Sequence, residues 1–192
     1  MGKLARDELN SALHVDGARI FNAAVAHNVS VGEMCAGADS ISICLSKGLG
    51  APLGSVLVGE SEFIRLAKRA RKRCGGGMRQ AGVVAAMGMY AVENNVERLK
   101  DDHDRAKRLA AELQMAGFRL PRNGAVDTNM FYFALPENSV VSTEEFCQEV
   151  EQKYGIRLIG GYSKGGELIR AVTHMHITDE CIDRSAEAII KV

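Results

Sequence analysis

The chain has 192 residues, of which 46% are hydrophobic and 25% are charged, and this is the composition of a globular protein rather than a disordered or fibrous one. Its 24 basic and 24 acidic residues give a formal net charge of zero, so no basic excess indicates a nucleic-acid or membrane-surface partner. The longest apolar stretch, residues 83–92, is about half of what a membrane-spanning helix needs.

The five cysteines are scattered and include no CxxC pair, which argues against a disulfide framework or a zinc site and favours a reducing compartment. The first 13 residues are charged and lack the apolar segment of a signal peptide. We therefore expect a cytoplasmic protein.

Apolar periodicity and capping residues predict helices and strands that alternate along the chain, which favours an α/β fold followed by an α+β part. The predicted helices cover residues 3–11, 20–27, 61–73, 80–115, 142–154 and 178–191. The predicted strands cover residues 13–15, 40–45, 55–58, 129–135, 156–159 and 168–175.

The long helical tract at 80–115 changes composition along its length. Residues 81–92 are apolar all round and are expected to be buried, whereas residues 97–112 are charged and are expected at the surface. Such a switch is typical of a passage between domains. The expected domains are therefore 1–95 and 96–192.

Three segments carry chemistry, and the first is Asp16-Gly17-Ala18-Arg19 at the end of the short strand at 13–15. A carboxylate at the end of a buried strand is costly unless it is paired. Asp16 is therefore either a cap for the helix that begins after Arg19 or a carboxylate directed at a cationic ligand group.

The second segment begins at Ser46-Lys47-Gly48 and alternates glycine with other residues up to Gly54. It does not have the order of a Walker P-loop. Lys47 is either a surface lysine in a turn or a lysine held at the carboxyl edge of a sheet, where α/β proteins form ligand sites. A desolvated amine in such a place is nucleophilic, as Schiff-base chemistry requires.

The third segment is Gly75-Gly76-Gly77-Met78-Arg79, a glycine turn that opens a helix beside a cation. This arrangement is either an anion or phosphate site or a flexible turn.

Together these strings resemble one family. HVDGARIFNA, DSISICLSKGLGAPLGSVLVG, GGGMRQAG and IRAVTHMHIT occur in the order found in low-specificity L-threonine aldolases, and the resemblance runs from about His14 to the C-terminus. The resemblance implies a pyridoxal-phosphate enzyme of the aspartate-aminotransferase fold type. Residues 1–95 would then be part of the cofactor-binding large domain, and 96–192 a small α+β C-terminal domain.

The resemblance also implies roles for individual residues. Lys47 matches the lysine that carries the cofactor, Asp16 the carboxylate that keeps the pyridine nitrogen protonated, and Ala18 the small residue that lies against the ring. Arg19 and Arg170 match arginines that bind the carboxylate of the substrate. Arg79 and Lys72 match cations at the edge of the active site, which the family contributes partly across a dimer interface. Arg79 would contact the cofactor and Lys72 the substrate.

Members of the family are about twice as long as this chain, and the other half supplies a phosphate-binding loop, a histidine stacked on the cofactor and further strands. The resemblance therefore implies the C-terminal half of an aldolase that cleaves L-threonine or L-allo-threonine to glycine and acetaldehyde, as a homodimer or homotetramer. Two alternatives remain: an inactive remnant that binds a full-length aldolase, and a β-eliminating lyase of the same fold.

His174 and His176 are candidate metal ligands, because residues two apart on a strand share a face. No third ligand is apparent in the neighbouring sequence. We therefore expect a structural role for both histidines and no metal.

Overall fold

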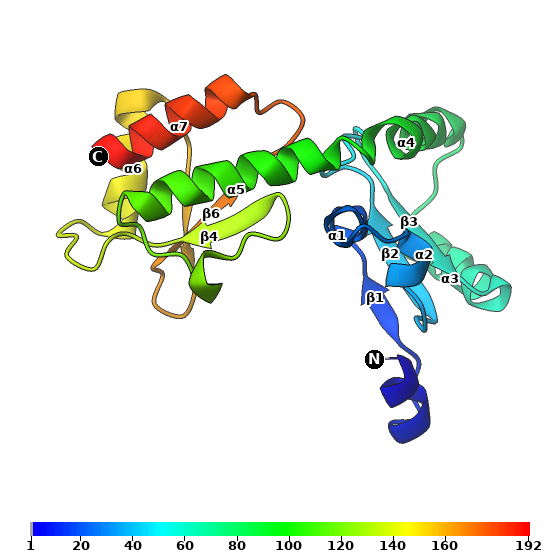
Figure 1. The fold of residues 1–192 in the computed structure, drawn as a ribbon. Helices are drawn as coiled ribbons and strands as arrows, with labels where there is room; N and C mark the ends of the chain where they lie inside the picture. The colour runs from blue at the N-terminus through cyan, green and yellow to red at the C-terminus, as the bar shows by residue number, and fades with distance from the viewer. Residues whose placement is uncertain (1) are drawn as a thin grey trace. The chain divides into compact units, whose positions relative to one another are not determined.

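A computed structural model describes residues 2–192, which form two compact units, one ending at Glu97 and the other running from Arg98 to Val192 (Figure 1). Each unit is described by itself. The elements of unit 1 are η1 (Leu4–Glu8), β1 (His14–Asp16), α1 (Ile20–His27), α2 (Val31–Met34), β2 (Ser40–Cys44), β3 (Ser55–Gly59), α3 (Ser61–Arg73) and α4 (Gly82–Asn95).

The sheet of unit 1 has the strand order β1-β2-β3. β1 pairs with β2 in parallel, with Asp16 opposite Ser42, and β2 pairs with β3 in the antiparallel sense. A parallel pair needs a crossover, and α1 and α2 provide it between β1 and β2. The carboxyl ends of β1 and β2 consequently lie at the same edge.

Local sequence signals fix the helix ends of unit 1. α1 spans the predicted residues, and Asn28 ends it in the left-handed conformation with φ of 53°. A capping box at Ser30 and Glu33 opens α2, since the Ser30 hydroxyl accepts the Glu33 N–H and the Glu33 carboxylate accepts the Ser30 N–H. α3 also spans the predicted residues.

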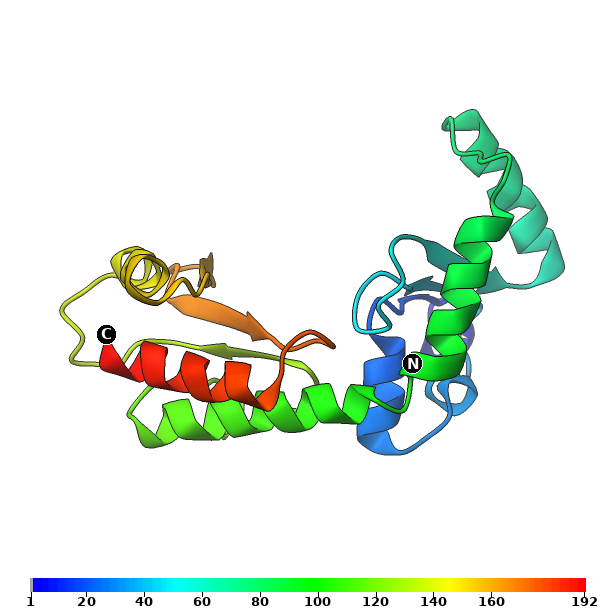
Figure 2. The ribbon, with the colours of Figure 1, turned by 90° about the horizontal axis from the view of Figure 1, so that it is seen from above.

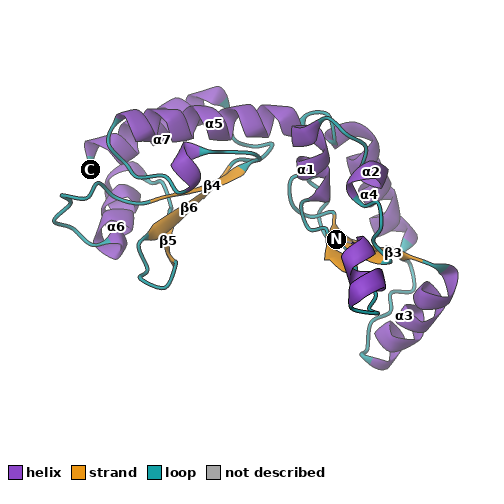
Figure 3. Cartoon of the chain, turned by 60° about the horizontal axis from the view of Figure 1, so that its bottom comes forward, coloured by secondary structure: helices purple, strands orange, loops and turns teal. Residues whose placement is uncertain are grey.

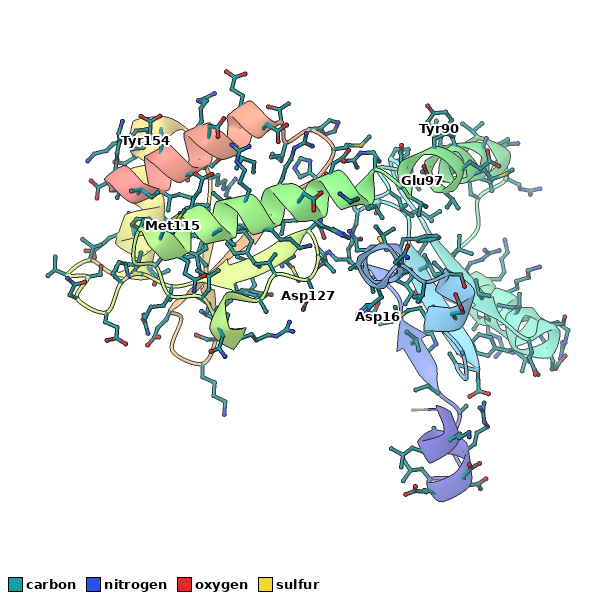
Figure 4. The ribbon with its side chains drawn as sticks, in the orientation of Figure 1. Asp16, Tyr90, Glu97, Met115, Asp127 and Tyr154 are labelled. Atoms are coloured by element: carbon teal, nitrogen blue, oxygen red, sulfur yellow. The ribbon has the colours of Figure 1, made fainter. Side chains whose placement is uncertain are left out.

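The prediction of one helical tract at 80–115 with a buried first half is wrong in two respects. The tract divides into α4 and, in unit 2, α5 (Leu99–Met115). The apolar first half is mostly exposed: only Gly88 and Ala91 of α4 are buried, whereas Tyr90 is 65% exposed (Figure 4). A helix that is apolar all round requires cover on every side, and the described residues cover α4 on one side only.

β1 is also less buried than predicted, since His14 and Asp16 are exposed and Val15 is half-buried. β3 exposes Val56, Leu57 and Val58, with exposed fractions from 38% to 46%. Successive residues of a strand point to opposite faces, so both faces of β3 are apolar and partly open.

Unit 2 is a three-stranded antiparallel sheet with helices along one face (Figures 2 and 3). Its strand order is β4-β6-β5. The elements are α5 (Leu99–Met115), η2 (Arg122–Gly124), β4 (Met130–Phe133), α6 (Thr143–Tyr154), β5 (Ile159–Tyr162), β6 (Leu168–Val172) and α7 (Asp179–Lys191). The predicted strand at 156–159 therefore begins three residues later than expected.

A continuous hydrophobic core joins α5, α6 and α7 to the sheet. Within this core, the Phe118 and Phe133 rings are in edge-to-face contact at a centroid distance of 5.8 Å. The buried members are Ala106, Leu109, Ala110, Leu113, Phe118, Phe131, Phe133, Leu135, Phe146, Val150, Ile169, Ala171, Ile182, Ala186 and Ile189.

A buried polar group ties the first turns of α5 to the sheet. The Thr173 hydroxyl donates to the Asp102 carbonyl oxygen at 2.6 Å, and the Asn129 amide donates to the Thr173 carbonyl oxygen at 2.7 Å. Arg98 forms an ion pair with the fully buried Asp102 carboxylate. These bonds fix the end of β6 and the start of the segment that contains His174.

The neighbouring His103 is buried, with 2% of its surface exposed. Burial lowers the pKa of His103 below its ordinary value of 6.5, and the positive charge of Lys107 acts in the same direction against the opposing charges of Asp102 and Asp104. The folded state therefore favours the neutral imidazole.

We predict that the unfolding free energy of unit 2 falls as the pH drops below about 6.5. Below that pH, His103 binds a proton in the unfolded state but not in the folded state. The unfolding free energy therefore changes by at most about 1.4 kcal/mol per pH unit. Urea unfolding of the wild type and of His103→Gln measures this, and the variant should lose most of the slope. An equal loss in His176→Gln, at an exposed site of the same unit, would contradict the prediction.

Candidate functional site

The candidate site begins at the carboxyl edge of β1 and β2. Asp16 is the last residue of β1, and Lys47 follows the last residue of β2 by three positions. Because the two strands run in parallel, both residues leave the sheet at the same edge. Figure 4 shows Asp16 at the end of β1 beside α1.

A tight turn holds the Asp16 carboxylate. Its Oδ1 atom accepts the Ala18 N–H at 3.0 Å, and the Gly17 N–H continues the parallel ladder to the Ser42 carbonyl oxygen at 2.8 Å. A Cβ atom at Gly17 would lie 2.9 Å from Cγ2 of Ile41 and 3.1 Å from the Ser42 oxygen, so only glycine fits.

Of the two alternatives for Asp16, the structure does not support a cap for the following helix. The N-cap residue of α1 is Arg19, and no side chain caps that end. The Asp16 side chain is exposed and forms no ion pair within residues 2–192. Its carboxylate is therefore accessible to a ligand.

The loop that carries Lys47 is anchored at several points. The Leu45 N–H donates to the Gly54 carbonyl oxygen, the Ala51 N–H to the Leu45 carbonyl oxygen, and the Gly50 N–H to the Lys47 carbonyl oxygen, at 2.9–3.0 Å. Gly50 has a φ of +74°, which favours glycine in this turn. Leu49 and Ala51 are buried, while the Lys47 side chain is exposed. The main chain at Lys47 is thus fixed and its amine is accessible.

Sequence reasoning missed two residues of α4 that fix this loop. The Asn95 amide donates to the Leu49 carbonyl oxygen at 2.7 Å. Gly88 lets Leu45 approach, since a Cβ atom there would lie 2.8 Å from the Leu45 Cδ1 atom. Both contacts join residues more than 40 positions apart, so no local sequence pattern predicts them.

Sequence reasoning also missed Cys44, the last residue of β2, whose Sγ atom lies 3.4 Å from the Ser46 hydroxyl. Burial raises the pKa of this thiol, but hydrogen bonds from Ser46 and Ser55 and the positive charge of Lys47 outweigh burial and leave the pKa below its ordinary value. Lys47 therefore already acts electrostatically on the end of β2.

Arg19 lies beside this edge with its Nε atom buried and, among the described residues, without a hydrogen-bond partner. It helps to line a small cavity with Ala18, Asn22, Cys44 and Leu49. An uncompensated buried donor is costly, and an acceptor supplied by a ligand would remove that cost.

The other predicted site residues lie apart from this edge. Lys72 lies in the last turn of α3, and Arg79 lies in the connection between α3 and α4, which is at the end of unit 1 opposite α1 (Figure 2). The Lys72 Nζ atom lies 3.4 Å from the position that a Cβ atom at Gly77 would occupy. Both Lys72 and Arg79 are exposed. Unit 1 by itself does not bring these cations together with Lys47 and Asp16.

Arg170 belongs to unit 2, on the central strand β6. Its guanidinium carbon lies 4.8 Å from the centre of the Tyr162 ring. The assignments of Arg170, Lys72 and Arg79 to the substrate and cofactor stay predictions.

His174 and His176 do not share a strand face, because β6 ends at Val172 and both follow it in a turn. The His176 N–H donates to His174 Nδ1 at 3.3 Å. Within residues 2–192, no group of three or more His, Cys, Asp or Glu side chains is placed to hold a metal ion. In the same residues, no helix has the length and apolar character of a membrane span.

Residues 3–136 match the model of the family described as Beta-eliminating lyase. The chain belongs to this family. Its resemblance to the low-specificity L-threonine aldolases is confirmed by relatives in two organisms. It is 43% identical over 173 residues to "Low specificity L-threonine aldolase" of Escherichia coli (strain K12), and 47% identical over 167 residues to "Low-specificity L-threonine aldolase 1" of Arabidopsis thaliana.

These matches cover 90% and 86% of this chain but only 48% and 45% of the relatives, so the chain spans about half of their length. The structure of threonine aldolase from Leishmania major has the same fold, with a TM-score of 0.75 at 19% identity, over 97% of this chain and 53% of that one. The predicted fold class, part of a pyridoxal-phosphate-dependent transferase-like fold, is thereby confirmed.

The family and its aminotransferase-fold neighbours identify the cofactor as pyridoxal phosphate. The residues at the carboxyl edge fit the ring end of that cofactor, because an accessible carboxylate suits the ring nitrogen and an accessible amine suits the aldehyde carbon. Among the described residues, Lys72 and Arg79 are not part of this edge, because Lys72 lies in the last turn of α3 and Arg79 in the connection from α3 to α4.

We predict that Asn95→Ala destabilises unit 1 by about 1–2 kcal/mol, because the substitution leaves the buried Leu49 carbonyl oxygen without its donor. Denaturant unfolding measures the loss, and amide exchange at Gly50 and Ala51 should accelerate with it. The matched control is Asn94→Ala, whose exposed bond to the Tyr90 carbonyl oxygen should contribute less than about 0.5 kcal/mol. Equal effects of the two variants would contradict the anchoring role.

Proposed function

We propose that this chain is the C-terminal half of a pyridoxal-phosphate-dependent lyase that cleaves L-threonine or L-allo-threonine to glycine and acetaldehyde. The observation that supports the proposal most directly is that Asp16 and Lys47 leave the β1–β2 pair at the same edge. The identities of 43% and 47% to threonine aldolases from a bacterium and a plant agree with it.

Each residue of the site has a distinct task in this reaction. The Lys47 amine would hold the cofactor covalently, and the Asp16 carboxylate would accept a hydrogen bond from its ring nitrogen and keep the proton there. The chemistry that pyridoxal phosphate would supply at this site is that of an electron sink for the Cα–Cβ bond of the substrate. Arg19 and Arg170 bind the substrate carboxylate, for which a planar guanidinium is well suited.

The order of the loop supports the role of Lys47. Its main chain is fixed by the anchors around Leu45, Gly50 and Ala51, while its side chain remains exposed. A fixed backbone limits the volume that the amine can reach, which lowers the entropic cost of bonding the cofactor.

β-Elimination is the second candidate reaction, and the description of the family model favours it. The two reactions give different products from the same substrate. Cleavage of L-threonine yields glycine and acetaldehyde, whereas elimination yields 2-oxobutanoate and ammonia. A coupled assay for acetaldehyde and one for ammonia therefore distinguish them.

An inactive assembly partner is the third candidate, and the open apolar surface of unit 1 favours it. Val56, Leu57 and Val58 on β3 and Tyr90 on α4 are exposed in the described chain. For the complete enzyme, whichever reaction it catalyses, we propose a homodimer or homotetramer located in the cytoplasm.

We predict that the 192-residue chain alone binds pyridoxal phosphate weakly and cleaves little threonine, because a phosphate dianion needs several convergent donors and the predicted ones in the described chain are only Arg79 and Lys72. Coexpression with the part of the Escherichia coli relative that this chain does not match should raise the soluble yield and restore a yellow complex. Cleavage by the isolated chain at the rate of the full-length relative would contradict this prediction.

We predict that Lys47→Ala abolishes the visible absorbance of that complex, at about 420 nm for a lysine-bound cofactor. Lys164→Ala, an exposed lysine of unit 2, serves as the control and should leave the absorbance unchanged. Reduction with borohydride followed by peptide mass spectrometry should find the cofactor on Lys47. Trapping at another lysine would refute the assignment and, with it, the role of the loop.

A further inference from the structure

The sheet of unit 2 has one face in the core and one face outside it. Phe131, Phe133 and Ile169 point into the core and are buried. The alternate side chains point the other way, and among them Tyr132 and Arg170 stand directly opposite each other on β4 and β6. Both are half-buried.

On this outer face, Arg170 packs against an aromatic pair rather than against a carboxylate. Its guanidinium carbon lies 4.8 Å from the centre of the Tyr162 ring, and the Tyr132 and Tyr162 rings meet at 5.6 Å with an interplanar angle of 66°. Within residues 2–192, Arg170 forms no ion pair and no side-chain hydrogen bond. Its charge thus lies over an aromatic ring, and its donors are unused among the described residues.

A bulge in β5 places Tyr162 on this face. Ile159 stands opposite Arg170 and Tyr162 opposite Leu168, so three steps along β5 correspond to two along β6. Without the extra residue, Tyr162 would point to the core side of the sheet. The bulge therefore decides that Tyr162 and Arg170 share a face.

Two glycines make the bulge possible. Gly161 has a φ of +87°, a conformation that other residues adopt only with strain. A Cβ atom at Gly160 would lie 2.6 Å from the Thr143 Cγ2 atom of α6. The sequence Gly-Gly-Tyr at 160–162 is thus what brings an aromatic ring to the arginine.

We propose that Tyr162 is a positioning residue that holds the Arg170 guanidinium ready for the α-carboxylate of an amino-acid substrate, with Tyr132 limiting the movement of the Tyr162 ring. The proposal rests on the proposed function, which assigns Arg170 to the substrate carboxylate. A ring stacked on the guanidinium plane leaves the N–H donors in that plane unobstructed.

The benefit of the stack is preorganisation. A free arginine side chain loses rotamer freedom when it binds a ligand, and a side chain that is already ordered loses less. A bidentate carboxylate contact depends on the orientation of the plane, so restricted rotation of the guanidinium should appear directly in the affinity for a carboxylate.

The first test measures guanidinium rotation in the full chain by nuclear magnetic resonance, using the Nε–H signal of Arg170. Tyr162→Phe keeps the ring and should rotate as the wild type does, whereas Tyr162→Leu should rotate at least about threefold faster. Tyr154→Leu, a half-buried tyrosine of α6, is the matched control and should leave rotation unchanged. Thermal unfolding of each variant verifies that unit 2 is folded.

The second test titrates the same variants with L-threonine and with L-threoninol, which carries a hydroxymethyl group instead of the carboxylate. Threonine, but not threoninol, should shift the Arg170 signal, and Tyr162→Leu should raise the dissociation constant for threonine at least about threefold. Tyr162→Phe should retain the wild-type value, because the hydroxyl takes no part in the stack.

The outcomes separate the two assignments. If Tyr162→Leu leaves rotation and threonine affinity unchanged while Arg170→Lys weakens threonine binding, Tyr162 positions nothing and the proposed function stands. If Arg170→Lys leaves threonine affinity unchanged, the assignment of Arg170 to the carboxylate is wrong, and the inference about Tyr162 is overturned with it. A Tyr162→Phe variant as weak as Tyr162→Leu would also overturn the inference.

Discussion

Main-chain hydrogen bonds between β1 and β2 are the interaction on which the candidate site depends. The parallel register sets Asp16 against Ser42, so that the carboxylate and the Lys47 loop leave the sheet on the same side. β1 has only three residues, and the ladder continues into the Asp16 turn through the Gly17 N–H. Any side chain at position 17 would collide with β2, so the chemistry of Asp16 depends on a glycine beside it.

Local signals explain why much of the fold could be predicted. The capping boxes at Ser30–Glu33 and Ser142–Glu145 act over one turn of chain, and both were legible in the sequence. The failures concern burial and register. The shift of β5 toward Tyr162 follows from its bulge and its pairing with β6, and neither is encoded in residues 156–159 alone. The exposure of α4 depends on which other segments cover it.

The same distinction applies to the site. Asp16 and Lys47 were predicted because strand ends, glycines and charged residues are adjacent in the sequence. Asn95 and Gly88, which anchor the Lys47 loop, act across more than 40 residues and have no local signature. The position of Tyr162 could not be predicted for a third reason. A single extra residue in β5 decides on which face of the sheet Tyr162 lies, and the two-residue alternation of a strand fails at a bulge.

The two units differ in how completely they bury their apolar surface, and this difference bears on function. Unit 2 encloses a core in which Phe133, Leu113 and Ile169 are fully buried. Unit 1 contains the predicted cofactor residues but leaves both faces of β3 and much of α4 open. The chain spans about half of the length of these relatives. Apolar burial is the main stabilising contribution to a folded domain, and a ligand that binds only the folded state adds to its stability. Completing the sheet and binding the cofactor would therefore stabilise the same unit, so in the proposed enzyme the assembly of unit 1 and the loading of Lys47 are thermodynamically linked.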